Sequence, residues 1–220
     1  DQASGTGDLV LSMPAGIQAD DFAIIWTRAD DTAATPPTLT LDDTETWTLI
    51  PGYPLNKDTT PAIPVRRSVE SFWTRKLTGT EGNVNAQINA SGEFGATLSV
   101  FRGVNTTTPI ADTAIDVTNT NEIQRANPAV TPTQPNSTLV LFAGYSMDDI
   151  NTAGAPTTPT GLTLGETIVG NTKDHRQMVV AYKLDLGPGT TQVTPGDWTH
   201  SVSATTVADP RLLSLILNPA

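Results

Sequence analysis

The chain has 220 residues, of which 37% are hydrophobic, and it carries a formal net charge of −11 and no cysteine. The acidic balance argues against binding to nucleic-acid phosphates or to an anionic membrane, while it favours solubility. Without cysteine the chain has no disulfide, thiolate nucleophile or cysteine-based zinc site. No apolar run approaches the roughly 20 residues that span a bilayer. Because the sequence starts at Asp1 without Met, we expect that residues upstream were removed or left out.

The composition predicts many short strands joined by irregular loops. Thr makes up about one residue in six, and Gly and Pro contribute 17 each. The branched Thr side chain suits a pleated strand, while Gly and Pro mark turns. The fold class we predict is all-β, an antiparallel β-sandwich or jelly roll.

Alternation of polar and apolar residues locates the strands. In Asn83–Ala90 the residues Val84, Ala86, Ile88 and Ala90 point one way and the amide side chains point the other, as in a half-buried strand. The strands predicted in this way are Asp8–Met13, Phe22–Arg28, Trp47–Ile50, Val69–Leu77, Asn83–Ala90, Phe94–Val104, Thr138–Tyr145, Leu162–Val169, Met178–Leu186, Trp198–Ala204 and Arg211–Leu217.

Two of these segments are predicted to be central strands. Phe22–Trp26 and Leu139–Ala143 are apolar on both faces, which is typical of strands covered on both sides. The one segment that could form a helix is Lys173–Leu186, but its alternating Met178, Val180 and Tyr182 favour a strand.

The elements occur in the same order in two halves of the chain, about 1–104 and 137–220. Asp21–Trp26, Thr46–Ile50, Phe72–Leu77 and Leu98–Val104 are followed in the second half by Thr138–Phe142, Gly161–Leu164, Val180–Leu184 and Leu212–Ile216. This order predicts a pseudo-repeat, although few residues are identical.

The polar stretch 105–136 lies between the halves and is rich in Thr, Asn and Pro. It could link two domains, or it could cross over within one domain. Because neither half offers enough predicted strands for an independent sandwich, we expect a single sandwich domain over 1–220 with this stretch as its crossover.

A search for catalytic groups finds none. His175 and His200 lack metal-ligand spacing, and no Gly-x-Ser-x-Gly elbow or phosphate-binding glycine loop is present. A pair of carboxylates such as glycosidases use stays open among 23 acidic residues, but nothing marks one out. The sequence therefore predicts that the chain is not an enzyme and needs no cofactor.

Paired aspartates raise the alternative of a calcium site. Asp30, Asp31 and Asp42 fall at strand ends or in loops, where carboxylate oxygens could bind Ca²⁺. No EF-hand spacing accompanies them, so the default interpretation is that they are solvated loop residues.

The four tryptophans divide into two groups. Trp26 and Trp73 alternate in phase with apolar residues and are predicted to fill the core. Trp47 and Trp198 are less clearly in phase, so they are the candidates for stacking on a sugar ring.

Several segments resemble a loosely defined group of phage virion-associated β-sandwich proteins, head and tail components with some bacterial surface proteins among them. Met13–Ile24 resembles the group's P-x-G-x-x-x-G-D-hydrophobic opening, and Trp47–Ile50 resembles its G-W-T-L strand. Phe72–Leu77, followed by Thr80 and Glu81, resembles its aromatic-x-Arg strand before an acidic turn.

The last matching segment, Leu98–Asn105 with Pro109, resembles the group's Y-R-G-V-D…P motif. The matches cover about 110 residues in the group's order, with Asp20 where Gly is usual and Phe101 where Tyr is common. The resemblance implies a β-sandwich of a virion and no catalytic residue.

The resulting expectation is a capsid decoration or cement protein on the exterior of a phage particle, which is extracellular after release. Its partners would be the major capsid protein, other virion proteins and further copies of itself, with a trimer favoured. The alternatives are a tail or fibre adhesin that binds a host surface glycan, a jelly-roll hydrolase and a bacterial surface module.

Overall fold

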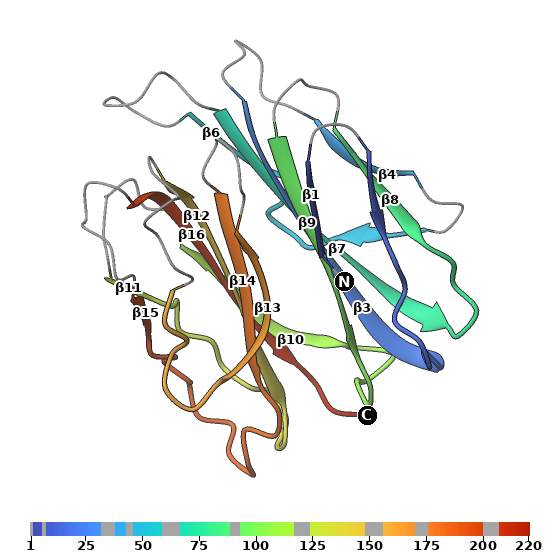
Figure 1. The fold of residues 1–220 in the computed structure, drawn as a ribbon. Helices are drawn as coiled ribbons and strands as arrows, with labels where there is room; N and C mark the ends of the chain where they lie inside the picture. The colour runs from blue at the N-terminus through green and yellow to red at the C-terminus, as the bar shows by residue number, and fades with distance from the viewer. Residues whose placement is uncertain are drawn as a thin grey trace. The chain divides into compact units, whose positions relative to one another are not determined.

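The computed structural model describes residues 2–5, 8–31, 38–42, 46–58, 67–88, 93–116, 124–147, 156–169, 176–199 and 207–220. These residues form strands and no helix, and every strand pair is antiparallel (Figure 1). The chain divides into two compact units, 1–103 and 104–220, and each pairing lies within one unit. The all-β fold predicted from the sequence is confirmed.

Unit 1 contains two sheets. One has the order β1-β9-β3-β7-β5, with β6 also paired to β7, and the other has the order β2-β8-β4. The strands are β1 (Gln2–Gly5), β2 (Leu9–Leu11), β3 (Ala19–Asp31), β4 (Leu39–Asp42), β5 (Thr48–Leu49), β6 (Leu55–Asp58), β7 (Arg67–Thr78), β8 (Val84–Ile88) and β9 (Glu93–Phe101).

The core of unit 1 lies between these sheets. Ile25, Trp73 and Leu98 from the larger sheet share one hydrophobic cluster with Leu11 and Ala86 from the smaller one. Two facing sheets with alternating inward side chains make a β-sandwich. The polar face predicted for β8 is confirmed, because Asn85 and Gln87 are partly exposed.

Unit 2 repeats this plan with fewer strands. Its larger sheet has the order β10-β16-β12-β14-β13, and β11 pairs with β15. The strands are β10 (Ile110–Asp116), β11 (Gln124–Ala126), β12 (Thr138–Met147), β13 (Thr163–Val169), β14 (Arg176–Lys183), β15 (Asp197–Thr199) and β16 (Val207–Leu217). Its core combines Leu141, Val179 and Leu212 from the sheet with Trp198 of β15.

The two segments predicted to be central are the middle strands of their sheets. β3 lies between β9 and β7, and β12 lies between β16 and β14. Residues 21–29 and 139–145 are all buried, so an apolar run without alternation marks each of these strands. Within the segment that could have been a helix, Arg176–Lys183 is a strand, β14.

The matched halves agree in strand order. The strands paired by their sequence order are β3 with β12, β5 with β13, β7 with β14 and β9 with β16, and both sheets place them in the order 9-3-7-5 and 16-12-14-13. The pairing of β2 with β8 also has its counterpart in the pairing of β11 with β15. A common origin of the halves stays a prediction, which this agreement supports.

Two expectations about organisation need correction. The stretch 105–136 is not only a crossover, because β10 and β11 lie within it and belong to the sheets of unit 2. Each unit also holds more strands than were predicted for its half, with β1, β4 and β6 added in unit 1. The argument for one shared sandwich from too few strands therefore no longer holds, and the single domain stays a prediction.

Candidate functional site

The aspartates proposed for calcium lie in two different sheets of unit 1. Asp30 and Asp31 end β3, and Asp42 ends β4. The backbone of these residues is described, but their side chains lie outside the described part of the structure. Strand pairing does not bring Asp42 next to the other two, since β4 pairs with β8 and β3 with β7 and β9. Among the side chains that are described, no three His, Cys, Asp or Glu gather as metal ligands would.

Three of the four tryptophans are buried. Trp26 is fully buried and stacks on Phe72 with ring centroids 5.5 Å apart, and Trp73 is 7% exposed. Trp198 is also fully buried, and its indole Nε1 donates a hydrogen bond of 3.0 Å to Asn127 Oδ1. A ring without an exposed face cannot stack on a sugar, so Trp198 is corrected from a glycan contact to a core residue.

Trp47 is the remaining aromatic candidate. It is half-buried, precedes β5 and packs against the core cluster of unit 1. Its partial exposure leaves the glycan role as a prediction. His175 and His200 lie outside the described residues.

A buried aspartate joins two of the segments that resemble the phage group. Asp21 accepts hydrogen bonds of 2.9 Å from both Nε and Nη2 of Arg102 and one of 2.8 Å from the backbone N–H of Gln18. Arg102 Nη2 also donates to the carbonyl oxygen of Gly16, at 2.9 Å. Together these bonds fix the turn before β3 to the end of β9.

The charge state of Asp21 follows from these contacts. Hydrogen bonding to Arg102 lowers the pKa of Asp21, burial opposes that effect, and the Gln18 N–H and the charge of Arg102 lower the pKa further. The net result is a pKa below the ordinary value of 3.8, so the carboxylate is ionised at neutral pH. An ionised acid held by two guanidinium bonds is a poor proton donor and fits a structural role.

The neighbouring Asp20 explains a departure from the group's motif. Its φ is +73°, in the left-handed region, where Gly is the residue without steric cost. Asp tolerates this region better than most residues. Its carboxylate also lies 2.7 Å from the ammonium group of Lys76, an exposed ion pair that contributes little.

A second carboxylate organises the turn after β7. Glu81 accepts hydrogen bonds from the backbone N–H groups of Thr78 and of Gly79, the latter at 2.9 Å, and its Oε1 lies 3.4 Å from Arg75 Nη2. Burial alone would raise the pKa of Glu81, but these backbone hydrogen bonds hold it below its ordinary value. The carboxylate in the motif's acidic turn therefore stabilises the backbone of that turn.

Gly79 is required at this turn for a steric reason. Its φ is +90°, and a Cβ there would come within 2.7 Å of the backbone nitrogen of Ala19. No side chain can be accommodated without moving the start of β3.

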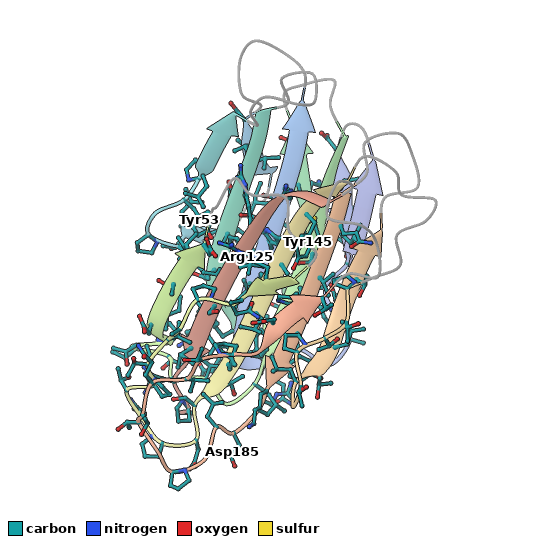
Figure 2. The ribbon with its side chains drawn as sticks, turned by 90° about the vertical axis from the view of Figure 1, so that its left-hand side faces the viewer. Tyr53, Arg125, Tyr145 and Asp185 are labelled. Atoms are coloured by element: carbon teal, nitrogen blue, oxygen red, sulfur yellow. The ribbon has the colours of Figure 1, made fainter. Side chains whose placement is uncertain are left out.

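Unit 2 contains its own partly buried polar group. Arg125 of β11 forms an ion pair with Asp116 of β10. Tyr145 of β12 lies near Arg125 in the same unit (Figure 2). Burial raises the pKa of Tyr145 strongly, and the charge of Arg125 offsets this only in part. The phenol stays protonated over the physiological range and cannot serve as a base.

Four charged side chains of the motifs therefore have structural partners. Asp21, Arg102, Arg75 and Glu81 each bond to a partner within unit 1. The sequence did not pair Asp21 with Arg102, although both belong to segments that carry the resemblance.

Comparison with protein families, with curated proteins and with solved structures gives no match. In the part of the chain that the structure describes, no helix has the length and hydropathy of a membrane span.

Proposed function

We propose that this chain is a non-enzymatic structural protein of a phage virion, a decoration or cement protein that binds the outer surface of the capsid. One observation carries the proposal: the charged residues of the motifs that resemble virion proteins brace turns and strand ends. Asp21 holds Arg102, and Glu81 holds the turn at Gly79. Motifs used in this way suit a protein whose role consists of contacts.

The charge of the chain supports the same role. A net charge of −11 keeps a protein soluble at high local concentration, as display in many copies requires. The proposed partners are the major capsid protein and further copies of the chain, with a trimer favoured, and the location is the virion exterior.

The test is to purify particles, image them and count the copies of this protein on each. Copy numbers in the hundreds, arranged around symmetry axes, would support decoration of the capsid. A handful of copies at one vertex would point to a tail component. Absence from purified particles, with the protein present in the lysate, would overturn the virion role.

A tail or fibre adhesin is the second candidate, because Trp47 retains a partly exposed aromatic ring. Binding to a glycan array that is lost in Trp47→Ala would support it. The matched control is Trp47→Phe, which keeps an aromatic face. An array without signal would remove this candidate.

A further inference from the structure

We propose that the free edge of β13 is a self-association surface, on which a second copy of this chain pairs its own β13 antiparallel about a two-fold axis. The proposal stands on this edge alone and does not rest on the virion role.

The β13 edge is open in the described structure. β13 runs over seven residues and pairs with β14 on one side, with no described strand on the other. Thr163, Leu164 and Gly165 are exposed, and Leu164 is 47% exposed although it is a large apolar residue. An open edge presents unpaired N–H and C=O groups that can continue a sheet into another chain.

Two other edge strands of the large sheets, β5 and β10, are blunted in ways that β13 lacks. β5, which holds the matching position in unit 1, has only two residues. β10 has seven, but its Asp112 accepts a hydrogen bond from the Thr131 N–H and its Asp116 pairs with Arg125. Short length and inward-facing charges are the usual protections against edge pairing. In β13 the corresponding protection is a bulge between Leu164 and Glu166.

The charge pattern favours a second copy as the occupant. The described stretch 156–165 that leads into β13 contains no charged residue, in a chain whose net charge is −11, and Glu166 is the one charged residue of β13. Two such acidic chains repel each other over most surfaces, and they can approach most easily where both are neutral. A neutral strip of this kind is therefore a part of the surface that tolerates an identical partner.

The exposed side chain of Leu164 also fits a two-fold arrangement. If the axis passes through Leu164, this residue lies directly opposite Leu164 of the second copy, with Cβ atoms about 5 Å apart. One contact then covers both exposed leucines, as in any isologous interface. Because the bulge limits pairing to the first part of the strand, we expect a weak dimer that depends on concentration.

The experiment measures self-association of the full chain by sedimentation equilibrium over a wide concentration range. We expect a monomer–dimer equilibrium for the unmodified chain. Leu164→Asp should weaken the dimer at least tenfold, since like charges would lie opposite each other. The control is Leu184→Asp at a residue that is 62% exposed and lies outside β13, and it should dimerise like the unmodified chain.

A charge-swap mixture tests the register. Leu164→Asp and Leu164→Lys should each be monomeric alone and should form a heterodimer when mixed. Amide hydrogen exchange of the unmodified chain adds a readout without substitution, with slower exchange in β13 at high concentration. A chain that stays monomeric, or an oligomer that Leu164→Asp leaves intact, would overturn the proposal. An intact trimer of that kind would leave the virion role standing.

Discussion

The two units share the backbone conformation at the start of their central strands, but different side-chain contacts hold it in place. In unit 1 the residue before the buried Asp21 is Asp20 with φ +73°, and in unit 2 the residue before the buried Ser137 is Asn136 with φ +60°. Asp20 is the second residue of β3, and Asn136 lies two residues before β12, the central strands of their sheets. The left-handed backbone is thus common to both units, and Asp and Asn are the residues besides Gly that adopt it most readily.

The side chains that fix this backbone conformation differ. Arg102 follows β9 and binds Asp21 as a charged pair, while Asn218 follows β16 and is buried among neutral partners. Asn218 Nδ2 donates to the Thr108 carbonyl oxygen at 2.8 Å, and Asn218 Oδ1 accepts from Thr133 Oγ1 at 3.0 Å. Ser137 bonds to the Gln134 carbonyl oxygen. The backbone path is the shared requirement, and the ion pair is one of at least two ways to hold it.

The largest expected effect is the loss of a core tryptophan from either unit. Trp26→Ala and Trp198→Ala should each lower the free energy of unfolding by about 3–5 kcal/mol, because both rings are fully buried. Urea unfolding measures this, and two resolved transitions would show which unit each variant affects. Trp47→Ala, at a half-buried ring, serves as the milder control. A loss below about 1 kcal/mol for Trp198→Ala would contradict its place in the core.

The next largest difference in stability is expected at two turn glycines, one in each unit. Gly79→Ala combines left-handed strain with a backbone clash, so we expect a loss of about 2–4 kcal/mol. Gly187 has φ +86° and open space where a Cβ would lie, so Gly187→Ala should lose only about 1 kcal/mol. Gly187 lies in the turn that also contains Asp185 (Figure 2), whose carboxylate accepts the Gly187 N–H. Equal losses at the two positions would show that the close approach of Ala19 does not constrain unit 1.

A smaller difference in stability is expected between substitutions of Asp21 and Ser137, at the start of the two central strands. Asp21→Asn keeps the shape of the side chain and removes its charge, and the lost charged hydrogen bonds predict a cost of about 1–3 kcal/mol. Ser137→Ala removes one neutral hydrogen bond, for which about 1 kcal/mol is expected. Thermal and urea unfolding of both variants would measure the difference. A larger loss from Ser137→Ala would reverse the comparison.

Acid should weaken unit 1 through the same carboxylates. The folded-state pKa values of Asp21 and Glu81 are lowered, so their contribution is fully present above the unfolded values of about 4. That contribution is lost as the pH falls through the folded values. Urea midpoints between pH 6 and pH 3 should therefore fall less for Asp21→Asn than for the unmodified chain. Parallel curves would show that the ionised Asp21 adds no stability.

Periodicity was sufficient where a strand is purely apolar or cleanly alternating. The central strands β3 and β12 and the half-buried β8 were predicted for this reason. β10 was missed because Asp112 and Asp116 interrupt its apolar residues. The structure shows that these carboxylates have local partners, Thr131 N–H and Arg125, which a sequence window does not contain.

The candidate site was harder to predict, because its pairs are formed between distant parts of the chain. Asp21 and Arg102 are 81 residues apart, and Trp198 and Asn127 are 71 apart. Trp198 was considered for sugar binding because it is less clearly in phase with the apolar residues around it. Its burial comes from sheet packing around it, a tertiary effect that local polarity does not report.

The pairing of β1 with β9 and of β10 with β16 has a consequence for folding during synthesis. In unit 1 Gln2 pairs with Thr97, and in unit 2 Asp116 pairs with Leu212. Each of these pairings can form only after almost a hundred further residues have been synthesised. At typical elongation rates that synthesis takes roughly 5–20 s. Until then β10 has no neighbour in its sheet, and long-range pairing of this kind makes folding slow.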